Sequence, residues 1–276
     1  MSIEKKPLVN DLYTADPSAH VFNGKIYIYP SHDEDIDVEN NDNGDQYDMK
    51  DYHVYEMPDT ETYPRDCGCV LKLEDIPWAS KQLWAPDCVE KDGKYYFVYP
   101  ARDKEGFFRI GIAIGDKPEG PFKPEPNYIP GSYSIDPCMF PDTDGKYYLT
   151  FGGIWGGQLD QYRNNKWSAD NKEPQGDEEA CTAKIALMKD NLLEMAEEPK
   201  DIMILDENGK PLTGGDEARR YFEDPWMFKK GDTYYFTYST GTTHLLCYAT
   251  SKSVYGPFTY GGVILTPVLG WTTHHS

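Results

Sequence analysis

Four stretches of the chain share one pattern of apolar and polar positions. Each begins with an acidic residue beside a proline, continues through a short spacer to a turn containing glycine, and ends in a run of aromatic and β-branched residues. Runs of this kind on either side of Asn-Gly, Asp-Gly or Gly-Asp turns predict β-hairpins. We therefore expect an all-β protein. The four acid and proline steps, with their turn glycines, are Asp16-Pro17 with Gly24, Pro86-Asp87 with Gly93, Asp136-Pro137 with Gly145, and Asp224-Pro225 with Gly231.

The four hairpins are internal repeats, because an acid next to a proline precedes the turn glycine each time. The acid comes before the proline in three of them and after it at Pro86-Asp87. The turn glycines lie 69, 52 and 86 residues apart, which is in the range of propeller blades with long loops. A single repeat of this size cannot bury its own apolar face, so repeats pack radially or in stacks. The innermost strand of a propeller blade begins near the central channel. Acids at the start of successive repeats are therefore expected to meet around one axis.

Length and charge narrow the class of protein. A chain of 276 residues suffices for one large all-β domain, and we expect residues 1–276 to form a single catalytic domain. The net charge of −20 repels phosphate backbones and anionic lipids, so neither nucleic acid nor a membrane is expected as a partner. The start, Met1 to Lys6, has no apolar signal core, which predicts a cytoplasmic protein.

Two other features are expected to carry no chemistry. None of the six cysteines forms a C-x-x-C pair, so no disulfide, zinc site or thiol nucleophile is predicted. Residues 34–51 are crowded with acids and asparagines around Gly44. An EF-hand loop with its glycine there would need a glutamate at the position of Lys50, so we expect a solvated surface loop instead.

The acids that open the repeats are suited to glycoside hydrolysis. That reaction uses two carboxyl groups, one protonated to donate to the leaving oxygen and one ionised to activate water or attack carbon. Clustered carboxylates raise one another's pKa, which keeps the acid protonated near neutral pH. Acid and proline pairs also start strands and cap turns, but acids in register in three repeats favour the catalytic interpretation.

The repeated motifs resemble those of glycoside hydrolase family 43 along essentially the whole chain. The resemblance implies a five-bladed β-propeller that inverts configuration at the anomeric carbon. The chain stops where a fifth hairpin should begin, so we expect an incomplete last blade, completed by a missing segment or a second chain. The motifs that carry the resemblance are Ala15-Asp16-Pro17, Trp84-Ala85-Pro86-Asp87, Ser134-Ile135-Asp136-Pro137, and the stretch from Phe222 to Phe228.

The resemblance also implies roles for three acids. Asp16 matches the general base that deprotonates water, Glu223 the general acid, and Asp136 the residue that raises the pKa of the acid and orients it. The base and acid carboxyls of an inverting pair are expected to lie roughly 6.5–9.5 Å apart. Asp224 is the rival for the acid. Strand alternation is expected to point it away from Glu223, which favours Glu223.

Further residues are expected to bind substrate and metal. Trp84, Trp155 and Phe222 are candidate apolar walls against a pentose ring, and each is equally suited to packing between blades. His274 resembles the axial histidine beside a calcium ion in the central channel, whose other ligands are largely water. His275 is the alternative, and a tail histidine without a role is the other interpretation.

The function implied is release of xylose or arabinose from pentose-containing oligosaccharides, as in β-xylosidases and α-L-arabinofuranosidases. The C-terminal sequence from Thr266 to Ser276 most resembles such members of the family. One alternative is an arabinanase that cuts α-1,5-arabinan. Another is a non-catalytic carbohydrate-binding propeller, although a binding module needs aromatic platforms rather than three converging acids.

Overall fold

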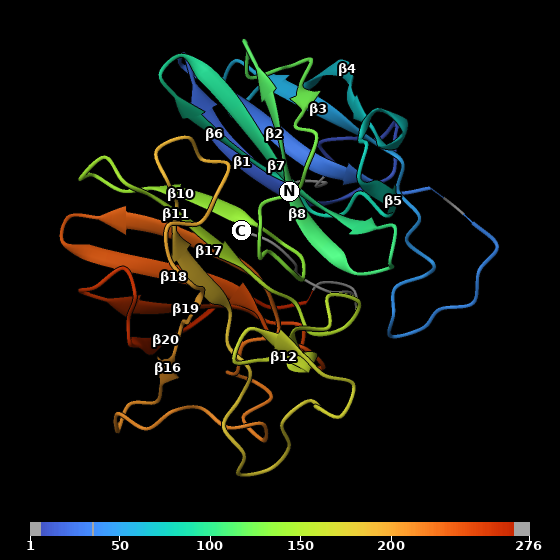
Figure 1. The fold of residues 1–276 in the computed structure, drawn as a ribbon. Helices are drawn as coiled ribbons and strands as arrows, with labels where there is room; N and C mark the ends of the chain where they lie inside the picture. The colour runs from blue at the N-terminus through green and yellow to red at the C-terminus, as the bar shows by residue number, and fades with distance from the viewer. Residues whose placement is uncertain (1–6, 35, 268–276) are drawn as a thin grey trace, which may run out of the picture.

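The described residues form four large, mainly antiparallel sheets arranged side by side (Figure 1) and one separate two-stranded hairpin. The computed structural model describes residues 7–34 and 36–267. Sheets from the N-terminal half, blue to teal, lie above those from the C-terminal half, green to red (Figure 1). Helical structure in the described residues is limited to two 3₁₀ turns, η1 (Leu73–Asp75) and η2 (Leu159–Gln161). No helix in this part of the chain is long and apolar enough to span a membrane.

Each sheet is numbered here by its order in the chain. Sheet I holds β1 (Thr14–Phe22), β2 (Lys25–His32), β3 (Asp51–Met57) and β4 (Arg65–Lys72). Sheet II holds β6 (Asp87–Lys91), β7 (Lys94–Asp103), β8 (Phe108–Gly115) and β9 (Lys123–Pro124), with β5 (Ala79–Lys81) also paired to β7. Sheet III holds β10 (Cys138–Pro141), β11 (Tyr147–Phe151), β14 (Lys184–Leu187) and β15 (Lys200–Asp201). Sheet IV holds β17 (Glu223–Lys230), β18 (Thr233–Ser239), β19 (Leu246–Ser251) and β20 (Phe258–Leu265), with β16 (Ile204–Leu205) parallel to β20. A separate hairpin pairs β12 (Tyr162–Arg163) with β13 (Lys166–Trp167).

All four predicted hairpins are confirmed, and each one begins a sheet. They are β1–β2, β6–β7, β10–β11 and β17–β18. The turn glycines Gly24, Gly93, Gly145 and Gly231 all have positive φ, which a glycine adopts without a steric penalty. The sequence pattern therefore located the hairpin that opens every sheet.

The first strand of each hairpin lies at the inner edge of its sheet. Within the described residues, β1 lies beside β6, β6 beside β10, and β10 beside β17, so the inner strands form an arc. The core fills the space between neighbouring sheets. On β7, Phe97 belongs to the apolar cluster shared with sheet I, whereas Val98 belongs to the cluster shared with sheets III and IV. Alternation of side chains along β7 thus buries both faces of sheet II.

The structure confirms a propeller-like arrangement of β-sheets but not the expected number of five blades. The described residues form four blade-like sheets in a propeller-like arrangement, not five. The physical reason is visible in the repeats, since one acid and proline hairpin starts each sheet and the chain has four of them. The fifth blade came from the family resemblance rather than from a repeat.

Candidate active site

Two of the acid and proline steps form the same β-bulge. Asp16 and Pro17 lie between the pairs Ala15↔Ser31 and Ser18↔Tyr29, so two residues of β1 face one residue of β2. Asp224 and Pro225 make the equivalent shift between Glu223↔Ser239 and Trp226↔Thr237. A bulge leaves one residue unpaired, and a proline there loses no ladder hydrogen bond because it has no N–H.

The acids at these steps adopt a left-handed backbone conformation. Asp16, Asp136 and Asp224 have φ of 49°, 54° and 60°. Aspartate tolerates this region better than most residues, because its short side chain bonds locally. The kink turns the inner strand at its start, so simple alternation no longer predicts the direction of the neighbouring side chains. The argument from alternation that set Asp224 aside therefore does not hold at this position.

Three carboxyl groups gather around Asp136 and form a cluster of four with it. Burial, followed by the charges of Asp224, Glu223 and Asp16 and a hydrogen bond with the Asp224 side chain, raises the pKa of Asp136 well above its ordinary value. The backbone N–H of Asp224 also donates to Asp136 Oδ2 at 3.3 Å. Asp136 and Asp224 are buried, whereas Asp16 and Glu223 are half-exposed. The structure thus brings together the three predicted acids and the rival, and their proximity disfavours ionisation of all four at once.

A glycine-rich turn at residues 152–157 seats Asp136. A Cβ at Gly153 would stand 2.6 Å from Ile135 Cδ1 and 3.2 Å from Asp136 Oδ2. The hydroxyl of Ser134 accepts from the N–H of Gly153 and donates to its carbonyl, at 3.0 and 3.1 Å. The turn packs directly against the central carboxyl because it lacks side chains there.

Sequence reasoning missed a fifth carboxyl, Asp33, at the end of β2. Burial, followed by the charge of Asp16, raises its pKa to about 6, and the nearby His32 opposes that shift. Its backbone N–H donates to the carbonyl of Tyr13 at 2.9 Å, which holds it beside β1. Counting outward from the Asn23-Gly24 turn places Asp33 next to the start of β1. The register of the hairpin could therefore have predicted that Asp33 lies near Asp16.

The acid of the second repeat has a different use. Asp87 follows its proline instead of preceding it, and it lies in the regular β6–β7 ladder opposite Val98. One carboxyl oxygen is 2.6 Å from His20 Nε2 on β1, and the other accepts from the N–H of Met139 on β10 at 2.8 Å. Asp87 is buried and ties sheets I, II and III together at the axis. Its one-residue displacement from the other acids distinguishes a structural role from a catalytic one.

The three predicted aromatic residues lie around the glycine-rich turn. Trp155 belongs to the turn, is 45% exposed, and meets Phe222 edge to face at 5.1 Å between ring centroids. Phe222 is buried beneath it. The indole of Trp84 is half-buried between Gly156 and Gly44, where an added Cβ on either glycine would come within 2.5 Å. Trp155 presents the most open ring face, while Phe222 supports it.

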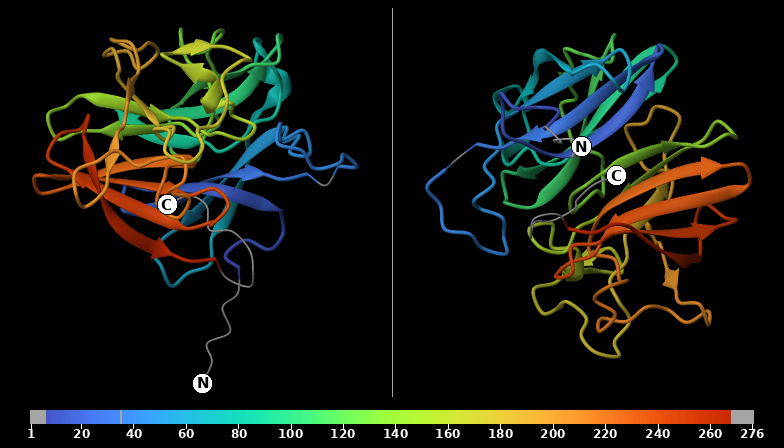
Figure 2. Two further views of the ribbon diagram at one scale, coloured as in Figure 1. Left: turned by 90° about the horizontal axis from the view of Figure 1, so that it is seen from below. Right: turned by 180° about the vertical axis from the view of Figure 1, so that it is seen from behind.

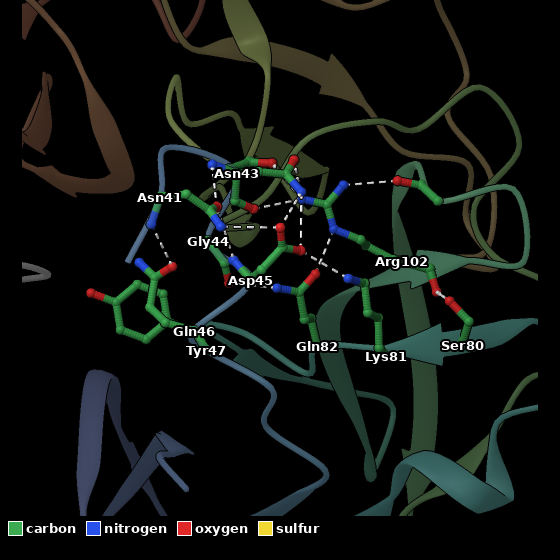
Figure 3. A network of polar contacts seen from close by, with 12 residues as sticks. Asn41, Asn43, Gly44, Asp45, Gln46, Tyr47, Ser80, Lys81, Gln82 and Arg102 are labelled. Atoms are coloured by element: carbon green, nitrogen blue, oxygen red, sulfur yellow. Dashed lines mark hydrogen bonds and ion pairs between the residues drawn. The ribbon is translucent and has the colours of Figure 1, made fainter. Parts of the chain in front are cut away.

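The acidic stretch is a largely exposed surface loop, as predicted, but one part of it is also anchored to the rest of the protein. Residues 36–50 leave the sheets as a long excursion (Figure 2), and the tip of that loop returns to a buried arginine, Arg102 (Figure 3). The guanidinium of Arg102 donates to Gln82, to Asn43 and to the carbonyl of Gly156. The N–H of Gly156 in turn donates to the carbonyl of Asp42 at 2.7 Å. Composition suggested a free loop because the buried arginine that pairs with it lies some 60 residues further along the chain.

A narrow cavity lies where the inner strands converge. A proline from each sheet lines it, namely Pro17, Pro86, Pro137 and Pro225, together with Ser18, Asp136 and Asp224. The buried hydroxyl of Ser18 has no hydrogen-bond partner among the described residues. Most of the lining is apolar, and the oxygens of Ser18, Asp136 and Asp224 are the side-chain groups that would suit a hard cation that keeps several of its waters. The predicted ligand His274, and its alternative His275, lie outside the described residues.

The match to a family model decides the identity of the chain. The model of the glycosyl hydrolases family 43 matches residues 5–266. The chain belongs to glycosyl hydrolase family 43. The carboxyl cluster at the starts of the inner strands therefore lies in a member of a glycosidase family.

Relatives in this family are close in sequence and in structure. A xylosidase/arabinosidase of Bacteroides ovatus is 58% identical, with 100% of this chain and 85% of the relative aligned. Xylosidase/arabinosidase 43A of Humicola insolens is 59% identical over 98% of this chain and 85% of its own. A family 43 β-xylosidase/α-arabinofuranosidase from a compost microbial metagenome, solved with xylotriose in a calcium-free form, superposes with a TM-score of 0.94 at 56% identity. That match covers 98% of this chain and 83% of the solved one.

In this family 43 enzyme, we expect the buried Asp136 carboxyl to be needed for activity and to lower the stability of the fold at high pH. Because the pKa of Asp136 is raised by folding, its contribution to stability is complete below the unfolded pKa of about 3.9 and falls as pH rises above it. Asp136→Asn removes the charge and keeps the shape. We expect it to raise Tm at pH 8 by roughly 2–4 °C, to leave Tm at pH 3.5 unchanged, and to abolish most activity. Thermal unfolding at both pH values and initial rates on an aryl β-xyloside measure these effects.

Asp142 provides a control, because its pKa is shifted in the opposite direction and its substitution should change Tm in the opposite direction. It is also a buried aspartate, and burial alone raises its pKa, but hydrogen bonds from Lys229 and Tyr234 outweigh burial and lower it. Asp142→Asn is therefore expected to lower Tm at pH 8 and to have less effect near pH 3. A loss of Tm at pH 8 in Asp136→Asn as well would contradict the repulsive carboxyl cluster.

Proposed function

We propose that the chain is an inverting exo-glycosidase that releases xylose from β-xylosides and arabinose from α-L-arabinofuranosides in short pentose oligosaccharides. The observation that carries the proposal is the cluster of four carboxyls, brought from three sheets to one place, in which burial and neighbouring charges raise the pKa of Asp136. Relatives carrying both activities in their names support the substrate class. Residues 1–276 act as one catalytic domain in this proposal.

In the proposed reaction, each of the two half-exposed acids, Glu223 and Asp16, makes one proton transfer. Glu223 donates its proton to the glycosidic oxygen as the bond to the anomeric carbon breaks. Asp16 accepts a proton from the water that attacks the opposite face of the sugar, so the product has inverted configuration. Asp136 is buried beside them. Negative charge in the cluster disfavours ionisation of Glu223, so Glu223 keeps its proton until the leaving oxygen takes it.

The rim of the site favours a ring-shaped substrate. The exposed face of Trp155, supported by Phe222, offers an apolar surface to a pentose, and Trp84 forms the adjoining wall on the side of the anchored loop. Apolar ring faces beside a few fixed polar groups are typical of small-ligand sites. In this proposal the walls bind the sugar and the carboxyls act on the bond next to it.

Calcium in the axial cavity belongs to the same proposal. The unpartnered Ser18 hydroxyl would hold a water molecule of the ion's shell, and His274 is the ligand that the resemblance implies. A bound divalent cation supplies positive charge that stabilises the carboxylates around it. The residues described here orient and exchange protons whether or not that charge is present.

A fifth unit against sheet I is likewise proposed. Val21 on β1 is 70% exposed and Tyr13 just before it is 78% exposed, as expected for a sheet face that packs against something else. A further segment of the protein or a second chain is the occupant expected from the family resemblance.

Hydrolysis assays test the function directly. We expect release of xylose from xylobiose and of nitrophenol from aryl β-xyloside and aryl α-L-arabinofuranoside, with α-xylose as the first product in proton NMR. Linear α-1,5-arabinan serves as the discriminating substrate. Turnover of arabinan with none of either aryl glycoside would assign the chain to the arabinanases, and binding of xylotriose without any turnover would assign it to carbohydrate binding alone.

A further inference from the structure

A second cluster of metal-binding side chains lies on sheet I, apart from the axial cavity. His32 at the end of β2, with Asp51 and His53 on β3, place one ligand atom each within 4.8 Å of one another. The β2–β3 ladder explains this. It pairs Ile28 with Tyr55, and continuing the same count puts His32 opposite Asp51. His53, two residues further on, shares their face of the sheet.

The three side chains are arranged as a binding site would require. They are only partly exposed, at 18%, 26% and 17% for His32, Asp51 and His53. The two imidazoles meet edge to face at 5.5 Å between ring centroids. His32 Nδ1 and Asp51 Oδ1 lie 2.6 Å apart, so two groups that could share an ion are already in contact. An ion between them would replace the proton that joins them now.

A fourth residue fixes the orientation of one ligand. Asp66 on β4 accepts from His53 Nδ1, with the nearer oxygen at 2.9 Å. A carboxylate bonded to one ring nitrogen holds the other, Nε2, ready for a metal, as in many zinc sites. Asp66 also accepts from the backbone N–H of Gly68, so it is itself held in place. This outer support distinguishes the cluster from a chance meeting of polar side chains.

A thiol lies next to the cluster. Cys69 on β4 is the ladder partner of His53. Among the described residues, its sulfur does not belong to the group of ligand atoms that lie within 4.8 Å of one another. A water molecule is therefore the expected fourth ligand of a tetrahedral ion held by two imidazoles and a carboxylate.

We propose that His32, Asp51 and His53 form a binding site for a transition-metal ion, with zinc as the preferred ion. Two imidazoles beside one carboxylate suit zinc and its neighbours, whereas calcium prefers a shell made of oxygens alone. The ion would tie β2 to β3 at the end of sheet I where Asp33 approaches Asp16. Its role is structural, and the site is separate from the catalytic carboxyls. The ligands come from strands about 20 residues apart, which is why a search for cysteine pairs did not find them.

Zinc binding to the metal-stripped full chain tests the proposal. Isothermal titration with zinc chloride, followed by metal analysis after dialysis, is expected to show one tightly bound zinc that a large excess of calcium chloride does not displace. His53→Ala is expected to weaken binding about 100-fold or more, because loss of an outer partner alone costs 10–100-fold in such sites. His244→Ala, a histidine in the loop between β18 and β19, is the matched control and should leave affinity unchanged.

Two further measurements test the metal site independently of the binding titration. Zinc should raise Tm in the wild type but not in His53→Ala, as expected for a ligand that binds only the folded state. Cobalt in place of zinc should give the strong visible absorption of a tetrahedral site, and this absorption should be absent in His53→Ala. Absence of tight zinc binding to the wild type overturns the proposal. Equal zinc affinity in His53→Ala, Asp51→Asn and the wild type overturns it as well.

Discussion

Glu223→Gln is expected to lower kcat/KM on xylobiose by roughly 10³- to 10⁴-fold, the upper part of the range for a general acid. The reason is that the sugar leaving group needs a proton as the bond breaks, and glutamine cannot give one. A dinitrophenyl β-xyloside leaves without that help, so its rate should fall by only about 10-fold. The contrast between the two substrates, measured as a ratio of kcat/KM values, identifies the acid independently of overall damage to the site.

Asp224→Asn is the matched control, because it alters a carboxyl one residue away on the same strand. Asp224 is buried against Asp136, so its loss is expected to slow both substrates by a similar factor. Should Asp224→Asn show the contrast between substrates while Glu223→Gln does not, the acid is Asp224. Thermal unfolding of both variants checks that the sheet is intact.

Asp16→Ala carries the second large expected effect. Removing the base leaves the attacking water without a proton acceptor, and this affects every substrate whatever its leaving group. We expect a loss of at least about 10³-fold on both xylobiose and the dinitrophenyl xyloside, with Tm nearly unchanged. Asp11→Asn, an exposed acid in the segment before β1, should stay within about two-fold of the wild type. Collapse of the fold in Asp16→Ala would make Asp16 a structural residue instead.

The two exposed acids are therefore separable by experiment. Loss of Glu223 depends on the leaving group, and loss of Asp16 does not. Loss of Asp136 is expected to combine low activity with higher stability at alkaline pH, because its buried carboxyl is held among other negative charges. Three different signatures from three acids would support the division of roles proposed above.

Much of the fold was predictable from the local amino-acid sequence. A proline, a glycine turn and alternating aromatic residues specify a hairpin with little help from distant residues, and all four hairpins formed where the pattern placed them. The meeting of Asp16, Asp136 and Glu223 followed from the repeats, because equivalent positions in radial repeats converge. Their individual roles came from the family resemblance and stay predictions.

Other features depended on contacts between distant segments. Asp224 joined the cluster because an αL bulge turned the strand, which alternation does not describe. Residues 41–47 became an anchored loop because Arg102, buried and far along the chain, needed acceptors. His32 and His53 met because the 18-residue connection from 33 to 50 returned β3 beside β2. The sequence by itself determined the hairpins and the convergence of the catalytic acids, since both depend on local order and repetition. Only the tertiary structure decided which other polar groups share a site, because burial and pairing depend on residues that the local sequence does not contain.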